Sequence, residues 1–275
     1  MTQTILKQFT RRALGLALLG CLAVITGGQT QTAPPADARG VIRLRVRVKI
    51  GEATKGLPRK RFFLIKGSLE ANKSLIQSLE QQPVISRDCY YRSIGASPQL
   101  IAWLKPTVWE SCESVYCREV EEKDADAVPE FQHAVADGEK EFGNRDLARK
   151  WLAVFLSEEI RSGFYKRLQK DLQALIKQAE EVSKAKVMSV MTDRNGTAYF
   201  TDLEPGVYVI SNILPTEIGT SSTLWNCEVR VKPGELPTEK PFLISNPGNK
   251  DPRDVKAIKC VSVEKPLPAC PAPNK

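Results

Sequence analysis

The sequence predicts an α+β fold: an antiparallel Greek-key β-sandwich interrupted by a mainly helical insertion. Alternation of apolar and polar residues marks strands before residue 69 and again after about residue 186, whereas apolar residues recur with helical spacing in between. Two early strands alone would not make a stable sheet, which disfavours two independent domains in sequence. We therefore expect residues 39–68 and 186–246 to form one sandwich around an insertion at residues 69–185.

The first predicted strand covers Val41 to Ile50 and is followed by a second strand from Arg61 to Lys66. In the first strand every second residue is apolar, and the residues between them are basic. Because successive side chains of a strand point to opposite faces, one face is expected to be buried and the other to be basic. The predicted basic face consists of Arg43, Arg45, Arg47 and Lys49.

The insertion is expected to contain several helices with recognisable ends. A helix is predicted over 69–82, because Pro83 ends its apolar spacing. Ser97 and Pro98 have the residue types of an N-cap and first turn, and Asn144 is a further N-cap candidate. Pro129 is expected to open another helix, residues 105–128 look irregular, and the longest helix should follow Ser157.

The most regular turn signals lie between residues 192 and 211. Asn195-Gly196 predicts a tight hairpin, since both residue types tolerate positive φ. Pro205-Gly206 predicts a second turn, and the apolar run 207–210 predicts a central strand. Tyr208 is placed like the tyrosine of a tyrosine corner, whose hydroxyl bonds to upstream backbone.

These segments resemble the carboxypeptidase regulatory-like, or transthyretin-like, β-sandwich module. The resemblance rests on Asp193, Asn195-Gly196, Phe200 and the run 203–208, which reads Leu-Glu-Pro-Gly-Val-Tyr. Residues 55–58 are similar to an earlier turn of that module, and residues 229–244 to its closing strands. The resemblance implies a sandwich fold and an accessory, spacer or binding role, and it does not extend to the insertion.

The N-terminal residues have the pattern of a secretory signal. Basic residues at positions 7, 11 and 12 precede an apolar run that is too short for a permanent membrane span. We expect a signal peptide over residues 1–38 with cleavage after Ala38. The alternative is a bacterial lipobox at 18–21 that would lipidate Cys21. Either route gives an exported protein that is periplasmic, on the outer cell surface or secreted.

The remaining cysteines predict disulfide bonds, because their number is even and the chain is expected to be exported. Three lie before residue 120 and three after residue 220, so complete pairing needs at least one bridge between the two regions. Their connectivity is otherwise open, and a Pro- and Lys-rich tail at 247–275 is expected to be tied down by the last two. A metal site is disfavoured, since the chain has a single His, and we expect no cofactor. The disulfide candidates are Cys89, Cys112, Cys117, Cys227, Cys260 and Cys270.

Charge is distributed unevenly along the chain. Residues 41–73 contain ten Lys or Arg and two acids, whereas residues 119–146 contain ten Asp or Glu and three bases. The two regions could face each other or remain solvated. The alternative is that the basic face binds an anionic envelope polymer or lipid headgroup. We expect no nucleic-acid partner, because no nucleic-acid-binding motif occurs.

Few residues suggest catalysis. His133 is the single histidine, and residues 93–97 suggest a nucleophile loop but lack the Gly-x-Ser-x-Gly elbow. Glu158 and Glu159 are adjacent carboxylates, yet glycoside hydrolysis needs two carboxyl groups that face each other across a cleft. The sequence therefore favours a protein without catalysis over an enzyme.

An aromatic cluster near the first cysteines is the candidate ligand-binding site. Flat rings held by disulfide-bonded loops could stack on a glycan or a peptide, although they could equally form the core of the insertion. The sequence predicts an exported envelope module that binds a glycan, peptide, protein or anionic polymer and meets a membrane only through a lipid anchor. The alternative is a hydrolase of peptidoglycan or another polysaccharide at the junction of insertion and sandwich. The candidate residues are Tyr90, Tyr91, Arg92, Trp103, Trp109 and Tyr116.

Overall fold

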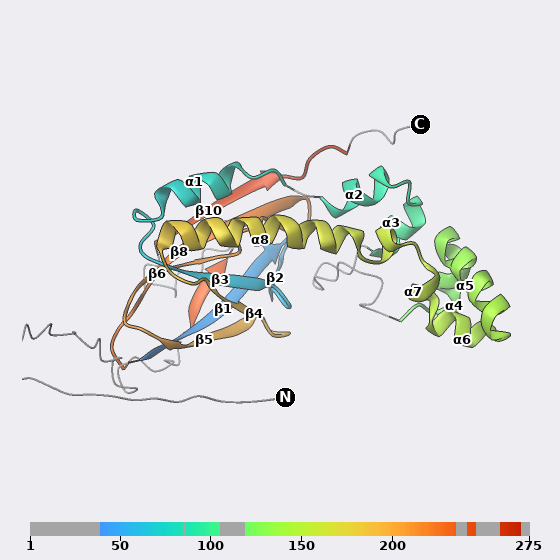
Figure 1. Ribbon diagram of the computed structural model, residues 1–275, viewed down its shortest axis with the longest axis horizontal. Helices are drawn as coiled ribbons and strands as arrows, with labels where there is room; N and C mark the ends of the chain where they lie inside the picture. The colour runs from blue at the N-terminus through green and yellow to red at the C-terminus, as the bar shows by residue number, and fades with distance from the viewer. Residues whose placement is uncertain (1–38, 85, 105–118, 235–240, 246–258, 271–275) are drawn as a thin grey trace, which may run out of the picture. The chain divides into compact units, whose positions relative to one another are not determined.

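The computed structural model describes residues 39–84, 86–104, 119–234, 241–245 and 259–270, and Figure 1 shows how their elements are arranged. The described chain combines helices with antiparallel sheets, which confirms the predicted α+β class. The predicted signal peptide with Cys21, and the candidates Cys112 and Cys117, lie outside the described residues.

The first sheet is built on β1 (Gly40–Ile50), the predicted alternating strand. β1 pairs in antiparallel fashion with β2 (Ala53–Gly56) and β5 (Thr197–Leu203). It also pairs with β9 (Phe242–Ser245), and this pairing is parallel. The first sheet therefore departs from the purely antiparallel sheet that the sequence predicts.

The second sheet has the strand order β10-β8-β6-β3-β4, with a short strand, β7 (Thr216–Ile218), paired to β8. All its described pairings are antiparallel. The strand predicted from the apolar run 207–210 is β6, which lies between β3 and β8 and is central, as predicted. The other strands of this sheet are β3 (Arg61–Lys66), β4 (Met188–Met191), β6 (Gly206–Ser211), β8 (Ser221–Val231) and β10 (Lys259–Pro266).

One apolar core lies between the two sheets. The inward residues of β1 pack there with Phe62 of β3 and Trp225 of β8. The Trp225 ring is fully buried, its centroid is 6.0 Å from that of Phe62, and its indole N–H donates to the Ser245 carbonyl at 2.9 Å. Because Ser245 belongs to β9, this hydrogen bond joins the second sheet to the first. A buried Trp with a satisfied N–H is among the largest single contributors to a core.

A tyrosine ties the turn between β5 and β6 to the second sheet. The hydroxyl of Tyr208 donates to the Glu204 carbonyl at 2.8 Å, which is the tyrosine-corner hydrogen bond predicted from the sequence. Burial raises the pKa of this hydroxyl. Beside it, the Lys66 ammonium lies 3.0 Å from a Glu204 carboxylate oxygen, and that hydrogen bond raises the pKa of Lys66.

Two helices cover the other face of the second sheet (Figure 1). α1 (Lys73–Gln81) and α8 (Phe164–Ser183) bury their apolar stripes against strand residues that point away from the first sheet. Leu79 of α1 and Ala179 of α8 are fully buried in this layer with Val209 of β6. Helix α1 begins four residues later than predicted, since residues 69–72 form turns that end in the buried Asn72.

The helical lobe consists of α2 to α7 and the N-terminal part of α8, which share a separate apolar core. Helix α8 joins both cores, because Phe164 packs in the lobe and Leu175 packs on the sheet. Among the described residues, no helix is long and apolar enough to cross a membrane. The lobe helices are α2 (Arg87–Ser93), α3 (Pro98–Leu104), α4 (Glu122–Ala127), α5 (Pro129–Phe142), α6 (Arg145–Lys150) and α7 (Leu152–Phe155).

The Asn195-Gly196 turn does not make the predicted hairpin. The turn itself is present, since one carboxylate oxygen of Asp193 accepts the N–H groups of Asn195 and Thr197 at 2.8 Å. However, the strand before it, β4, pairs with β3 in the second sheet, while the strand after it, β5, pairs with β1 in the first. The Gly196 N–H and carbonyl face neighbouring backbone, and its carbonyl accepts from Val46 at 2.7 Å. The turn therefore crosses between sheets.

Two further elements differ from the prediction. The expected Pro- and Lys-rich tail contains a regular strand, β10, whose partner is β8. The stretch expected to be irregular contains α4. Both segments are largely exposed, and β10 has few buried side chains, so neither shows the apolar spacing on which a prediction could rest.

Candidate functional site

The serine and histidine that could suggest catalysis have other surroundings. Ser97 caps α3: its hydroxyl accepts from the Leu100 N–H at 3.0 Å and lies 2.6 Å from a carboxylate oxygen of Glu130. This confirms the predicted N-cap. His133 lies exposed on α5 and makes no hydrogen bond or ion pair within the described part of the chain. Within that part, neither residue belongs to a nucleophile–base pair.

Glu158, one of two adjacent carboxylates, does not have the properties of a catalytic acid. Glu158 pairs with Lys166, and the hydrogen bond between them lowers the pKa of the Glu158 carboxyl. A general acid for glycoside hydrolysis needs a raised pKa so that its proton is still present at neutral pH. Glu158 is therefore ionised, and its role on the surface is to form an ion pair with Lys166.

The predicted aromatic cluster is divided between core and surface. Tyr91 and Trp103 belong to the core of the helical lobe, and the Trp103 ring packs edge-on against Phe131 with centroids 4.8 Å apart. Tyr90 is partly buried and Arg92 is exposed. Trp109 and Tyr116 lie outside the described residues. Since Tyr91 and Trp103 are already covered, neither ring is presented for stacking on a ligand.

The two tyrosines instead hold the lobe together through their hydroxyls. The chain before α8 makes a π-helical turn, Glu159–Gly163, whose wider spacing leaves carbonyl groups open to other donors. Tyr90 donates to the Glu159 carbonyl at 3.1 Å, and Tyr91 donates to the Ile160 carbonyl at 3.2 Å. Burial raises the pKa of Tyr90, and the nearby Glu159 adds to this shift. The role of these residues here is structural.

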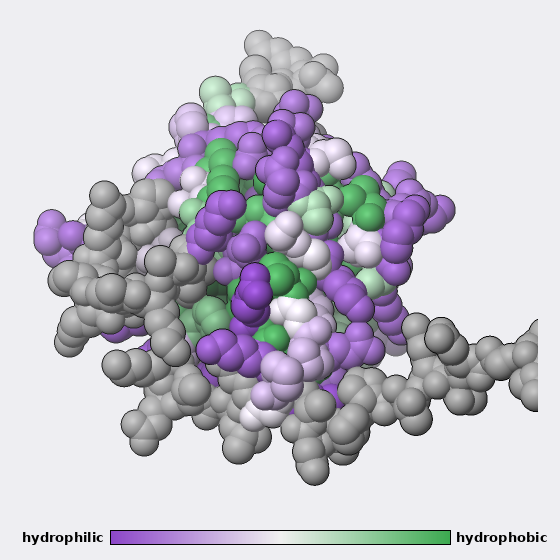
Figure 2. All heavy atoms as spheres, turned by 90° about the vertical axis from the view of Figure 1, so that its left-hand side faces the viewer, coloured by the Kyte–Doolittle hydropathy of each residue, from purple (hydrophilic) through white to green (hydrophobic). Residues whose placement is uncertain are grey.

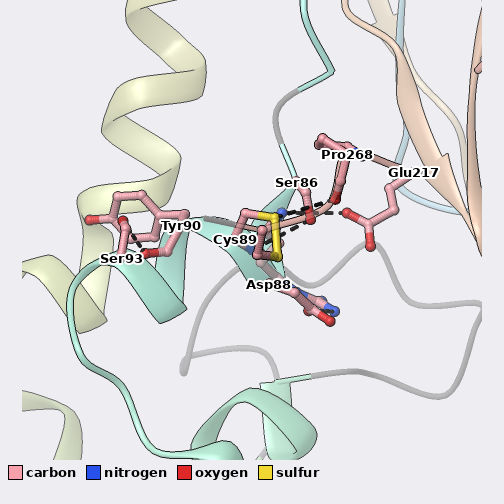
Figure 3. Close-up of a disulfide and its surroundings, with 9 residues drawn as sticks. Ser86, Asp88, Cys89, Tyr90, Ser93, Glu217 and Pro268 are labelled. Carbon is pink, nitrogen blue, oxygen red and sulfur yellow. Dashed lines mark hydrogen bonds and ion pairs between the residues drawn. A yellow bond between two sulfur atoms is a disulfide. The ribbon is translucent and has the colours of Figure 1, made fainter. Parts of the chain in front are cut away.

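A disulfide joins α2 to the end of the chain (Figure 3). Cys89 is bonded to Cys270, and the close-up shows Ser86, the N-cap of α2, and Glu217 of β7 beside this bond. The Arg87 N–H lies 3.5 Å from a Glu217 carboxylate oxygen. The bond thus connects the helical lobe to the segment that follows β10, and it is the bridge between the two cysteine regions that parity predicts.

A second disulfide joins Cys227 of β8 to Cys260 of β10. The two residues are directly opposite in the antiparallel register of these strands. Strand β10 is therefore held covalently at its first part and again just beyond its end. Both disulfides involve predicted candidates, and they show how the C-terminal segment is tied down.

The predicted basic face lies on the first sheet. In β1 the apolar residues between the cations are buried in the inter-sheet core, so Arg43, Arg45, Arg47 and Lys49 point to the opposite face. Of these, the arginine row, defined as Arg43, Arg45 and Arg47, forms no ion pair within the described residues. All three are partly buried, which fixes the stems of their side chains against the sheet.

Two donors of the arginine row lack an acceptor. The Nε atoms of Arg43 and Arg45 are buried and make no hydrogen bond within the described part of the protein. Leaving a buried donor unsatisfied costs about 1–3 kcal/mol, and more for a charged group, so such groups usually have a partner. The arginine row therefore combines uncompensated positive charge with open hydrogen-bonding capacity.

The strands beside β1 contribute no acid to the row. In register, Arg43 lies opposite Tyr199, Arg45 opposite Thr197 and Leu243, and Arg47 opposite Ser245 and Gly56. The Arg43 guanidinium is 6.0 Å from the centre of the exposed Tyr199 ring, within cation–π range. The sequence prediction missed Tyr199, since only the strand register reveals which residues flank the arginines.

Some acids of the lobe pair with bases of the lobe itself. Arg145 lies 2.7 Å from carboxylate oxygens of both Glu122 and Asp126, and the hydrogen bond to Glu122 raises the pKa of Arg145. Arg149 reaches Glu122 at 3.3 Å. Within the described residues no ion pair joins these acids to the arginine row, so the expectation that the two regions face each other has no support there.

Figure 2 shows a face of the molecule on which hydrophilic residues separate small groups of hydrophobic ones. A broad apolar patch of the kind that marks stable subunit interfaces is not found among the described residues of that face. No protein-family profile, curated protein or solved structure matches this chain. The arginine row is therefore the candidate functional site.

Proposed function

We propose that the protein is an exported binding module without catalytic activity, and that the arginine row on the first sheet binds an anionic polymer of the cell envelope. The observation that carries this proposal is a row of three guanidinium groups that lack any acidic partner in the described structure. Two of them also have a buried, unbonded Nε. An anionic ligand would supply the missing negative charge and would accept hydrogen bonds from the outer guanidinium nitrogens.

Among the ligands that the sequence left open, an anionic polymer fits this surface better than a neutral glycan. Neutral glycans are bound through exposed aromatic rings, and two of the predicted rings, Tyr91 and Trp103, are buried in the lobe. Guanidinium groups bind phosphate or carboxylate through paired hydrogen bonds. A row of them on one strand suits a ligand that carries repeated charges.

The fold proposal is a transthyretin-like Greek-key sandwich with a helical insertion. Support comes from the two facing sheets with one core, from the tyrosine corner at Tyr208, and from the described helices, which lie between β3 and β4 in the chain. Export is proposed from the N-terminal pattern, and the two disulfides are consistent with an oxidising compartment. The lipid anchor at Cys21 remains the alternative to cleavage after Ala38.

A binding assay with anionic polymers tests the proposed function. The purified protein with its disulfides formed should bind phosphate-rich or carboxylate-rich polymers and should not bind a neutral polysaccharide. Replacing all three residues of the arginine row by Ser should reduce the affinity at least tenfold, since each charge-assisted contact contributes about 1.5–3 kcal/mol.

The matched control is Arg230→Ser, because Arg230 is an exposed arginine on β8 of the second sheet. This variant removes one charge, as the single variant Arg45→Ser does, and it should bind the polymer nearly as well as the wild type, whereas Arg45→Ser should bind it more weakly. Failure of the wild type to bind any anionic polymer would refute the proposal. Equal loss in the control would show that only net charge matters.

A further inference from the structure

We propose that the polymer is a phosphodiester chain whose phosphates are linked through three-carbon spacers, as in poly(glycerol phosphate). This inference rests on the proposed function of the arginine row and adds the chemical class of its ligand. The starting observation is geometric: Arg43, Arg45 and Arg47 occupy every second position of the regular strand β1. Two residues of an extended strand span about 6.6–6.8 Å, and this distance sets the repeat of the row.

The repeat of the ligand follows from counting bonds. Two extended residues contain six backbone bonds, because each residue contributes N–Cα, Cα–C and C–N. Two phosphorus atoms joined through a three-carbon spacer are also separated by six bonds, P–O, O–C, C–C, C–C, C–O and O–P. Extended chains with equal numbers of backbone bonds have similar repeats. Consecutive phosphates can therefore meet consecutive arginines without either chain leaving its extended form.

The position of the charge favours phosphodiesters over polymers of acidic sugars. In a phosphodiester the charge lies in the backbone itself, and rotation about the spacer bonds lets each phosphate turn to the same side. In a polyuronate the carboxylates are substituents on rigid rings, and the twist of the chain turns successive rings to different sides. Fewer carboxylates of such a polymer can therefore face the arginine row, because the three arginines lie on one side of β1.

The neighbours of the row favour a spacer without bases. A single-stranded nucleic acid has the same three-carbon spacing, but its bases need aromatic partners for stacking. The residues paired with the row are small or aliphatic apart from Tyr199, namely Gly56, Thr197, Leu243 and Ser245. A slender polyol phosphate can lie along these residues, with the Tyr199 and Thr197 hydroxyl groups beside its free hydroxyls.

Repulsion within the row gives the ligand a further advantage. Unit charges at the strand repeat repel each other by about 0.6 kcal/mol per neighbouring pair in water, and more where water is partly excluded. A polyanion in register neutralises all of them at once. A single phosphate relieves the repulsion around only one arginine, so affinity should depend on the number of linked phosphates.

The test compares ligands by titration calorimetry with the oxidised protein. Glycerol phosphate oligomers with one, three and many repeats are measured beside polygalacturonate and oligothymidylate of matched charge. We expect a steep rise in affinity up to three repeats and only a small rise beyond, since the row has three arginines. The polymer should bind at least tenfold more tightly than polygalacturonate and oligothymidylate.

Variants locate the register. Arg45→Ala removes the central charge and should weaken binding of the three-repeat oligomer about tenfold, whereas Arg230→Ala should leave it unchanged. Affinity that does not depend on the number of repeats, or polygalacturonate or oligothymidylate binding as tightly as the polyol phosphate, would overturn this inference and leave the proposed function standing. Absence of binding to every anionic polymer would instead remove the proposed function as well.

Discussion

The two-sheet core and the helical lobe are stabilised in different ways. The sheets share a continuous apolar core in which Trp225 and the inward residues of β1 are almost completely buried. The lobe consists of short helices with caps, and it depends on a few specific contacts from outside each helix, such as the Tyr90 and Tyr91 hydroxyls on the π-helical turn. Regular burial protects the sheets against single changes at the surface, whereas the lobe should respond to the loss of single contacts.

The two regions also use charge differently. In the lobe, acids and bases are interleaved and Arg145 and Arg149 bind their own carboxylates. On the first sheet, the arginine row has no acidic neighbour in the described register. The lobe nevertheless keeps an excess of acids, since residues 119–146 contain ten Asp or Glu and three bases, so its surface would repel the anionic ligand proposed for the row. The proposed ligand site therefore lies on the first sheet, and much of the lobe has a structural role.

The largest expected effect is the loss of a core aromatic. Trp225→Ala should lower the free energy of unfolding by about 3–5 kcal/mol, since it leaves a cavity and removes the hydrogen bond to the Ser245 carbonyl. Phe131→Ala removes an equally buried ring from the lobe. Hydrogen exchange should show general loss of protection in the first variant and loss mainly within α2–α7 in the second. Identical exchange patterns in both would contradict the separation into two cores.

Removal of the lobe disulfide should have the next largest effect. Cys89→Ala with Cys270→Ala is expected to cost about 2–4 kcal/mol in urea unfolding. Cys227→Ala with Cys260→Ala is the matched control. The disulfide that it removes closes a loop of 33 residues, whereas the Cys89–Cys270 disulfide closes a loop of 181 residues. The chain-entropy relation predicts a loss about 1.5 kcal/mol larger for the longer loop. A larger loss in the control would mean that β10 depends on its disulfide more than the lobe does.

A smaller effect is expected at the contact between α2 and the π-helical turn. A Cβ atom at Gly163 would clash with the Tyr90 hydroxyl oxygen, so Gly163→Ala should destabilise the lobe by about 1–3 kcal/mol. Tyr90→Phe removes that oxygen. The double variant should therefore lose less stability than the two single variants added together, and thermal unfolding measures this difference. If the stability losses of the two single variants add up in the double variant, the new Cβ atom does not clash with the Tyr90 hydroxyl.

The smallest effect should be an alkaline loss of stability. The pKa values of Tyr90 and Tyr208 are raised in the folded protein, mainly by burial. The unfolded chain therefore releases these protons first, near pH 10. Their contribution is complete below that pH and is lost as pH rises through the folded pKa. Tyr208→Phe should flatten the decline measured by urea unfolding between neutral and strongly alkaline pH, and an unchanged slope would contradict the assignment.

Local patterns predicted most of the sheet elements. The alternation in β1 is strong enough to identify both its buried face and its basic face, and Pro205-Gly206 with Tyr208 identifies the turn into β6. The partners of these strands could not be predicted in this way. The Asn195-Gly196 turn is equally compatible with a hairpin and with a crossing between sheets, because both use the same local geometry.

The candidate site could be predicted only in part. The arginines follow from alternation, but their lack of acidic neighbours depends on the register with β5 and β9, which are far away in the sequence. For the aromatic cluster, the spacing of the rings in the sequence does not distinguish a ligand-stacking surface from a core. Tyr91 and Trp103 belong to the core because α5 and α8 pack over them. Long-range packing decided both outcomes.

The salt dependence of polymer binding tests the central claim most directly. Three arginines that each displace a counterion from a single-stranded polyanion predict a slope of about −2 for the logarithm of the affinity against the logarithm of salt concentration. Arg45→Ala should make this slope shallower by about 0.7, and Arg230→Ala should leave it unchanged. Equal slopes in the wild type and in Arg45→Ala would contradict the account, because the arginine row would then not be the surface that binds the polymer.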